Sequence, residues 1–487
     1  MRTGALPGCK VMVGEFAAIS EIPVDNEVHV LDKFPALKWY PQQEEWVRDP
    51  CGSDNSCFNY PLALRLEGVL NRGALRQALQ EIVRRHQVFR SVFGIEAQEV
   101  IRMVLQPHAV SVAEVDLEPV CLEDRQSEAL RLAVQDAQKP FDLTLEPLLR
   151  ATLLRLDTEE CILLLMTHHF ACDDWSIDIL LGELSDLYSE FSNGRPSSLP
   201  EINYQYSDFV RQHTSEMQGD EQESRLRYWR QQYDGAGRFY YLSTDYPRPA
   251  RPAFLGGHEA AVLPELLDAG IKRFSQTDGI SPFVTLVGGL LCILGGYSGR
   301  EDIGVGICVA NRNHFEAEEL IGPFSNRLLL RAKVTGTLTS REMLEGVRSA
   351  TWDAYSFQEV PFGELLEEVA SGSKADCSRL FQMLIVFENA PRTPREFAGL
   401  KVSRFPFDTG RACYDLHVWL RNQDGLQITI KYDVSLFAPE TIRRIMNDYQ
   451  RILKSIISEP DGLVKNLSVS LPAGVEYSLP GVVDVLR

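Results

Sequence analysis

The sequence predicts an α+β protein built from two lobes. Candidate strands and helices are mixed without the strict alternation that a doubly wound parallel sheet requires. With 487 residues, 44% of them hydrophobic, the chain has an ordinary globular composition and room for two or three domains. Breaker-rich stretches at 192–200 and 244–252 separate its halves. We therefore expect four parts: an N-terminal extension (1–37), an N-terminal lobe (38–200), an inter-lobe connection (201–255) and a C-terminal lobe (256–487).

The first half shows both strand and helix periodicity. Alternating leucines predict a strand at 61–67, and Asn71 is a good N-cap for the helix that follows. Apolar runs at 148–156 and 161–166, joined by a polar turn, predict a pair of strands. The second run is apolar throughout, as in a strand buried on both faces. Helical spacing then covers 180–191.

The second half repeats these ingredients in another order. Ser281-Pro282 is a typical helix start, and it opens a charge-free stretch, 281–298, that contains four glycines. That stretch is short for a membrane span, so we expect a buried helix. Further strands are expected at 303–309, 327–334, 383–387, 414–420 and 426–432, and further helices at 266–274, 341–355 and 439–457.

Charge and cysteine usage restrict the partners and the compartment. The net charge of −19 disfavours broad nucleic-acid binding, because an acidic surface repels phosphates. The ten cysteines contain no C-x-x-C pair, so no metal site is expected. The first residues lack the apolar core of a signal peptide. We therefore expect a cytoplasmic protein with reduced thiols, no membrane contact and a monomeric state.

The most informative segment is Met166-Thr-His-His-Phe-Ala-Cys-Asp-Asp-Trp-Ser176. Its two histidines stand at the end of a buried strand, where a rigid scaffold can present a side chain to a cleft. Neighbouring side chains on an extended backbone point to opposite sides, so one histidine can face a cavity while the other packs inward. Histidine exchanges protons near neutral pH, which suggests a general base. The alternative is structural: a buried histidine pair, with Asp173-Asp174 capping the next helix.

Several segments together resemble one family. His168-His169-Phe170-Ala171-Cys172-Asp173-Asp174 is similar to the His-His-x-x-x-Asp-Gly signature of condensation domains from nonribosomal peptide synthetases. The other similar segments occur in the family's order, seven in all, between about residues 38 and 460. They are Tyr40-Pro-Gln-Gln-Glu-Glu-Trp46, Arg85-His-Gln-Val-Phe-Arg-Ser-Val-Phe93, Tyr204-Gln-Tyr-Ser-Asp-Phe209, Ile321-Gly-Pro-Phe-Ser-Asn-Arg-Leu-Leu-Leu-Arg331, Gln358-Glu-Val-Pro-Phe362 and Ser378-Arg-Leu-Phe-Gln382.

The resemblance implies a fold and a reaction. The fold is a pseudodimer of two chloramphenicol-acetyltransferase-like lobes in a V, with a tunnel between them. A donor acyl or peptidyl thioester and an acceptor aminoacyl thioester reach the site on phosphopantetheine arms of two carrier proteins, and the chain itself binds no cofactor. The acceptor amine then attacks the donor thioester. Partners are thus donor and acceptor carrier proteins.

Site residues follow from the same resemblance. His169 is the expected catalytic histidine, as a general base or as a group that positions the reactants. His168 is expected to support the loop, and Asp173 to form an ion pair with either Arg85 or Arg90. The remaining residues are expected to shape the cleft, the tunnel or the lobe contacts; they are Asp174, Trp175, Ser176, Asn326, Arg331, Ser378 and Arg379.

Asp174 is the one departure from the signature, which has glycine there. Glycine permits unusual dihedrals and close backbone approach, whereas aspartate adds bulk and charge. Normal catalysis, an altered acceptor preference and impaired condensation all stay open. So do an ester product, a coenzyme A-dependent acyltransferase and a non-catalytic carrier-docking module. Trp175-Ser176 retains the order found in peptide-forming members.

Two other segments have simpler interpretations. Leu294-Gly-Gly-Tyr-Ser298 is similar to the phosphopantetheine site of carrier proteins, but we interpret it as a helix-to-strand turn. Arg225, Arg227 and Arg230 form a candidate docking cluster for an acidic carrier, or else a solvated helix face.

Overall fold

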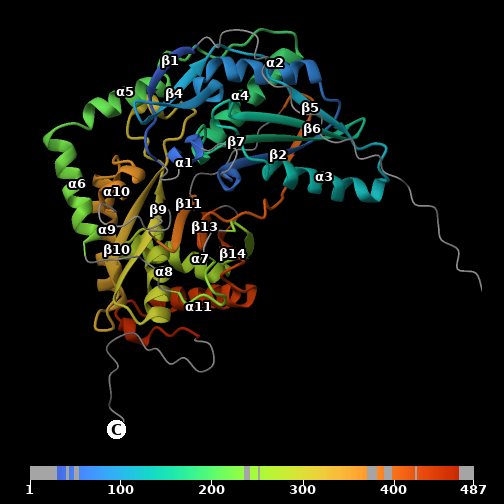
Figure 1. The fold of residues 1–487 in the computed structure, drawn as a ribbon. Helices are drawn as coiled ribbons and strands as arrows, with labels where there is room; N and C mark the ends of the chain where they lie inside the picture. The colour runs from blue at the N-terminus through green and yellow to red at the C-terminus, as the bar shows by residue number, and fades with distance from the viewer. Residues whose placement is uncertain are drawn as a thin grey trace, which may run out of the picture.

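The computed structural model describes residues 30–39, 43–48, 54–234, 242–249, 253–369, 381–388, 397–422 and 425–470 (Figure 1). Buried apolar side chains gather in two separate clusters, one for each half of the chain. In Figure 1 the blue-to-green half lies above the yellow-to-red half. The predicted α+β class with two lobes is confirmed. The V shape and the tunnel stay predictions.

The N-terminal lobe contains two sheets with strand orders β1-β4-β3 and β12-β2-β7-β6-β5. Strand β7 lies in the middle of the larger sheet, antiparallel to both β2 and β6, with helix α3 against it. The elements of this lobe are β1 (Val30–Pro35), α1 (Gln43–Arg48), β2 (Asn59–Glu67), α2 (Arg72–Arg85), β3 (Ser91–Glu96), β4 (Glu99–Leu105), β5 (Val112–Asp116), α3 (Leu122–Ala137), β6 (Leu149–Asp157), β7 (Glu160–His168), α4 (Asp174–Ser192), α5 (Tyr206–Glu216) and β12 (Lys401–Arg404).

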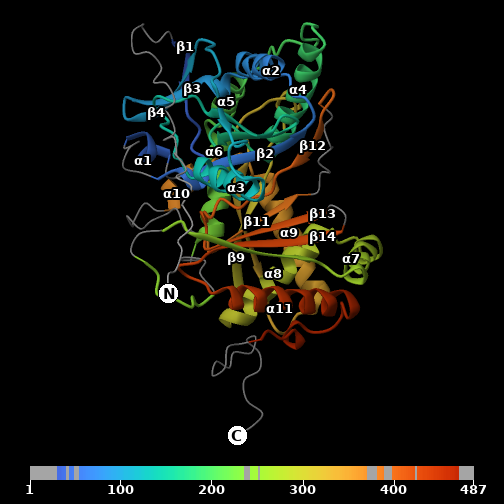
Figure 2. The same cartoon turned by 90° about the vertical axis from the view of Figure 1, so that its right-hand side faces the viewer.

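The C-terminal lobe is built on one six-stranded sheet of order β10-β9-β11-β13-β14-β8. Helix α8 packs against α9 and α11. Helix α11 lies in the lower part of Figure 2. The elements are α6 (Asp220–Tyr233), β8 (Gly256–Val262), α7 (Glu265–Asp278), α8 (Pro282–Ser298), β9 (Asp302–Val309), β10 (Asn326–Lys333), α9 (Ser340–Ser356), α10 (Phe362–Val369), β11 (Met383–Glu388), β13 (Leu416–Asn422), β14 (Leu426–Asp433) and α11 (Pro439–Ser458).

The predicted lobe boundaries need correction. Residues 30–35, assigned to the extension, form strand β1 and pair with β4. Helix α5, assigned to the connection, packs into the N-terminal core through Tyr206, Phe209 and Val210. Strand β12, from the C-terminal half, pairs with β2 and completes the N-terminal sheet. All three elements pack or pair with parts of the chain that are distant in sequence, and local periodicity does not encode such long-range contacts.

Local sequence signals were more reliable. Asn71 and Ser281 cap α2 and α8 through their side chains, as predicted. The segment 294–298 ends α8, and the Ser298 hydroxyl donates to the Leu294 carbonyl at 2.6 Å, which confirms the helix-end interpretation. In the described part of the chain no single helix is long and apolar enough to cross a membrane, although α7 and α8, bent by 113°, pass that test as a pair.

Candidate active site

Strand β7 delivers the histidine pair to the boundary between the lobes. His168 is fully buried and packs edge-on against Phe170, Phe141 and Trp46, with ring centroids 4.8, 6.0 and 6.2 Å away. Its Nδ1 accepts a hydrogen bond from the Phe170 amide at 3.2 Å. Burial holds the pKa of His168 well below its usual value, so this ring is neutral and structural. The predicted inward orientation is confirmed.

His169 points away from that core and is only half-buried. Its amide donates to the Phe58 carbonyl at 2.9 Å, and its ring meets the Tyr60 ring edge-on at 5.4 Å. Burial first, and then the Arg327 guanidinium, lower the pKa of His169 to about 4, although Asp173 opposes the shift. At neutral pH the imidazole is therefore uncharged and can accept a proton or a hydrogen bond.

Asp173 holds the loop between the lobes. It is the N-cap of α4, and its Oδ1 accepts from the Ser176 amide and hydroxyl at 2.8 and 2.7 Å. Its Oδ2 accepts from the amides of Phe324 and Ser325, both at 3.2 Å. The carboxylate is 2% exposed. With its lone pairs occupied, Asp173 serves as a structural anchor rather than a proton carrier.

The arginine that pairs with Asp173 is Arg312, and the expectation of Arg85 or Arg90 was wrong. Arg312 Nη2 lies 2.9 Å from Asp173 Oδ1, and both side chains are almost fully buried. Arg85 instead binds Glu183 at 3.0 Å, and Arg90 donates to the Leu105 carbonyl at 2.5 Å. Because Arg312 lies 139 residues from Asp173, only the tertiary fold brings the pair together.

Ser176 and Trp175 extend this contact between the lobes. The Ser176 hydroxyl, which donates to Asp173, accepts from Arg312 Nη2 at 2.8 Å and from the Gly322 amide at 3.0 Å. The Trp175 indole donates to the Glu318 carbonyl at 2.9 Å while its ring stays 44% exposed. Both residues therefore bind the segment between β9 and β10.

Asp174 occupies the first position of α4. Its backbone is not left-handed, so an L side chain causes no strain there. The carboxylate accepts a hydrogen bond from the Tyr60 hydroxyl, and the Tyr60 ring packs against His169. A carboxylate is also favourable at a helix N-terminus. Aspartate is thus accommodated at this position, and Tyr60 connects it to the candidate catalytic ring.

The other predicted residues lie in different surroundings. Asn326 is fully buried, and its amide donates to the carbonyls of Gln358 and Val360, both at 2.7 Å. Arg331 lies at the far end of β10, bound to Asp302 at 2.6 Å, so it does not shape the cleft at His169. Ser378, Arg379 and part of the opening motif lie outside the described residues.

The arginine cluster on α6 is not a free basic patch. Arg225 is paired with both Glu359 and Glu221, and Arg230 lies 2.8 Å from Glu223. We find no group of three or more His, Cys, Asp or Glu side chains suited to a metal ion within the described ranges.

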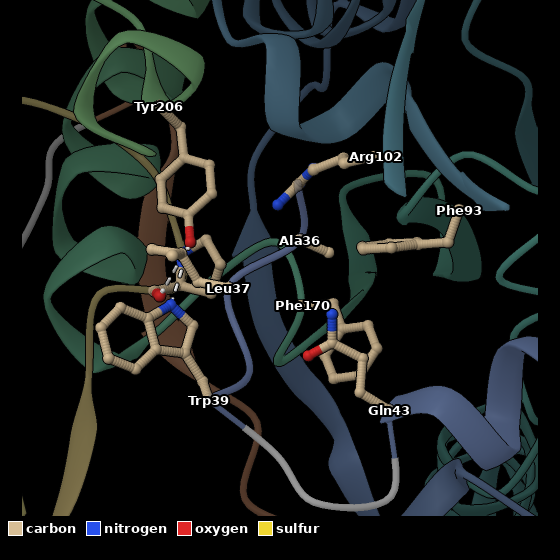
Figure 3. A pocket seen from close by; sticks show the side chains of 9 residues that line it. Ala36, Leu37, Trp39, Gln43, Phe93, Arg102, Phe170 and Tyr206 are labelled. Atoms are coloured by element: carbon tan, nitrogen blue, oxygen red, sulfur yellow. Dashed lines mark hydrogen bonds between the residues drawn. The ribbon is translucent and has the colours of Figure 1, made fainter. Parts of the chain in front are cut away.

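A small pocket of about 10 Å³, no larger than one water molecule needs, lies beside Phe170 (Figure 3). Phe170, Phe93 and Tyr206 line it, together with the buried cation Arg102. The Trp39 indole donates to the Tyr206 hydroxyl at 3.0 Å along one wall. His169 is not among the lining residues, so this cavity is separate from the candidate active site.

Sequence reasoning missed Arg312, Arg327 and His417. All three belong to the C-terminal lobe. Arg312 pairs with Asp173, and Arg327 lowers the pKa of His169. Burial first, and then Lys431, hold the pKa of His417 well below its usual value. Arg312 follows the buried strand β9, so its position after an apolar run was the available signal. No local sequence pattern distinguished Arg327 or His417 from other strand residues.

The buried histidines make stability depend on pH. Since folding lowers the pKa of His169 from 6.5 to about 4, the unfolded chain binds more protons in that window. We expect the free energy of unfolding to fall by about 1.4 kcal/mol per pH unit for each such histidine as the pH drops below about 6.5. Urea denaturation at about pH 7 and about pH 5 measures this. His169→Gln should reduce the slope, and an unchanged slope would contradict the lowered pKa of His169 in the folded protein.

Comparisons with known proteins agree over most of the chain. The family model described as "Condensation domain" matches residues 38–475. A linear gramicidin synthase of Brevibacillus parabrevis is 35% identical over 443 residues, and malpinin synthetase from Mortierella alpina is 33% identical over 445 residues. These matches cover 90% and 91% of this chain but only 8% and 6% of those relatives.

The fold has relatives among solved structures. The X-domain from teicoplanin biosynthesis superposes with a TM-score of 0.81 at 22% identity, covering 91% of this chain and 99% of that one. Such low identity shows a shared fold and nothing more. The family is shown by the match of the family model across residues 38–475. The chain belongs to the condensation-domain family of nonribosomal peptide synthetases.

Proposed function

We propose that this chain joins a carrier-bound acyl or peptidyl donor to the amine of a carrier-bound aminoacyl acceptor. The observation that carries the proposal is the position of His169 at the end of β7, in a loop that the buried Asp173–Arg312 contact ties to the other lobe. A pKa lowered to about 4 by burial and by Arg327 keeps this ring neutral. Both substrates would arrive as thioesters on phosphopantetheine arms of partner carriers. The chain itself contributes side chains and binds no cofactor.

The reaction balances without an additional reagent. The acceptor nitrogen attacks the thioester carbonyl carbon, the C–S bond breaks, and one proton moves from nitrogen to the departing sulfur. A base whose pKa is about 4 removes little from a free ammonium ion. It can take the proton once the nitrogen has attacked and become acidic. His169 would then pass that proton to sulfur, while orientation supplies much of the rate.

The test is a reconstitution with loaded carriers. Donor-loaded and acceptor-loaded carriers are mixed with the protein, and the acceptor carrier is analysed by intact mass. A condensed product on that carrier is the expected result. Replacing the donor carrier with the coenzyme A thioester tests the soluble-substrate alternative, and a hydroxyacyl acceptor tests ester formation. Product only from coenzyme A donors would reject the proposal.

A non-catalytic docking role is the second candidate, and Asp174 favours it. The carboxylate binds the Tyr60 hydroxyl, and the Tyr60 ring packs against His169, so the aspartate adds bulk and charge one side chain away from that ring. Because the backbone at 174 is strain-free, we expect instead that Asp174→Gly changes the condensation rate by less than about threefold, equivalent to less than about 1 kcal/mol.

Condensation assays with loaded carriers check this expectation for the natural protein, Asp174→Gly and Asp174→Asn. Asp174→Asn is the matched control, since it keeps the size and removes the charge. An inactive natural protein that becomes active as Asp174→Gly would support the docking role. Carrier binding without product in all three proteins would support it as well.

A further inference from the structure

A buried arginine of the N-terminal lobe borders the small pocket beside Phe170. We propose that this pocket is a binding site for a monatomic anion, chloride, held by the guanidinium of Arg102. The inference goes beyond the proposed function, because it concerns ion binding and does not depend on a condensation reaction.

Arg102 is a cation that the fold buries almost completely. It lies on β4 and is 2% exposed. Its Nη2 donates to the Val88 carbonyl at 3.2 Å, and its Nε has no hydrogen-bond partner in the described part of the chain. The rings of Phe93 and Tyr206 lie against the guanidinium, with centroids 5.3 and 5.1 Å from its central carbon. Arginine stays charged at physiological pH, so the lobe contains a buried positive charge beside this pocket.

No carboxylate of the described residues balances that charge by an ion pair with Arg102. Burial lowers the pKa of the guanidinium to about 10, an effect that Tyr206 and Cys172 oppose. Burying a charged group is costly unless the group is paired and hydrogen-bonded. A bound anion supplies both the opposite charge and a hydrogen-bond acceptor.

The acidic residues on the surrounding elements have other partners or face solvent. Asp173 lies 2.9 Å from Arg312, and this buried pair adds no net charge. Asp32 on β1 is paired with Arg211. The other acidic residues of β1, α1 and β4 are exposed; they are Glu44, Glu45 and Glu99.

The pocket has a suitable size and a second donor. Its volume of about 10 Å³ is close to the space that one water molecule needs, so a polyatomic anion such as phosphate does not fit. In Figure 3, Arg102 and Gln43 point into the pocket from opposite sides. Gln43 is 5% exposed, and the NH₂ group of its amide can donate to an anion. A water molecule fills the same space but carries no charge to balance the guanidinium.

The pocket walls belong to the structure that supports the histidine loop. Phe170 packs edge-on against His168, with ring centroids 4.8 Å apart. Pro323 comes from the segment between β9 and β10, where the Phe324 amide donates to Asp173 at 3.2 Å. A ligand that binds only the folded protein stabilises the fold by mass action. Chloride would therefore stabilise the packing behind this loop.

Thermal unfolding of the full chain at constant ionic strength tests the site in solution. When sodium chloride replaces sodium gluconate, each tenfold increase in chloride above the dissociation constant should raise the unfolding midpoint by about 1–2 °C. Bromide should act similarly, because it is also monatomic. Equal midpoints in chloride and in gluconate would overturn the inference.

A carboxylate built into the pocket gives the sharpest comparison. Gln43→Glu supplies a negative charge beside the guanidinium, so this variant should unfold at a higher temperature than the natural protein in gluconate. It should also lose the dependence on chloride. Gln43→Met is the matched control, since it is similar in size and uncharged, and its midpoint should still rise with chloride. A chloride response in Gln43→Glu as large as that in Gln43→Met would contradict the assignment.

Two arginine variants test the guanidinium itself. Arg102→Gln should remove the chloride response. Arg90→Gln should retain it, because Arg90 is also buried but is not among the residues that line the pocket. A folded Arg102→Gln protein with the natural response would overturn the inference. The Gln43 pair decides the question if either arginine variant fails to fold.

Crystals grown in bromide locate the ion directly. Bromide scatters anomalously, and we expect a peak within hydrogen-bonding distance of the Arg102 guanidinium in the natural protein and none in Gln43→Glu. A water molecule in place of that peak would overturn the inference. A peak without any chloride effect on unfolding would also overturn it, as binding at crystal concentration only.

Discussion

Replacing His169 with alanine is expected to reduce the condensation rate by about 100-fold or more, the usual contribution of a positioned proton-transfer group. The ring stands at the end of a central strand, and its neighbours Phe58 and Tyr60 hold it edge-on. Product formation on the acceptor carrier under single-turnover conditions measures the loss. Full activity in His169→Ala would remove the assigned role.

Two further variants separate chemistry from structure. His169→Gln retains a hydrogen-bonding group but cannot titrate, so substantial activity there would favour positioning over proton transfer. His108→Ala is the control: this histidine follows β4, and its carbonyl accepts from Gln80 at 2.6 Å, away from the histidine loop. We expect it to keep the natural rate. Unfolding temperatures of all three variants show whether a loss of rate reflects a loss of fold.

Replacing Arg312 with glutamine is expected to lower the free energy of unfolding by about 3–5 kcal/mol, because it leaves the Asp173 carboxylate buried without its cation. Arg312 is 9% exposed and also donates to the Leu320 carbonyl at 2.7 Å. Urea denaturation measures the change. The condensation rate should fall as well, since this contact joins the histidine loop to the C-terminal lobe.

A double-mutant cycle identifies the interaction itself. Arg312→Gln combined with Asp173→Asn should cost less than the sum of the two single changes, because no unpaired charge remains. Arg84→Gln serves as the surface control, since Arg84 is 41% exposed in its pair with Glu201 and should change stability by less than about 1 kcal/mol. Additive effects of Arg312→Gln and Asp173→Asn would contradict a coupled buried pair.

Local patterns predicted single elements well. The apolar run 161–166 became β7, and the segments 341–355 and 439–457 became α9 and α11 with small changes at their ends. Helix α3 and the small sheet of β1, β3 and β4 were not predicted, although α3 buries Ala129, Leu132, Ala133, Asp136 and Ala137 at helical spacing, so a local signal was present there. Strand β12 is short and mostly exposed, so its sequence carries little signal.

Short-range effects specify the histidine loop and the orientation of its two rings. Strand alternation sends His168 into the core and His169 outward, and the cap of α4 needs only Asp173 and its neighbours. Each of these effects acts within a few residues of backbone. The local sequence is therefore sufficient to predict them.

Tertiary packing supplies the partners of that loop. Arg312 reaches Asp173 across 139 positions of sequence, and the Arg327 guanidinium of β10 donates to the Trp39 carbonyl of the N-terminal lobe. The same packing dehydrates His169 and makes it a weak base. Charge pairing and desolvation depend on which surfaces meet in three dimensions, and no local pattern in the chain specifies that meeting.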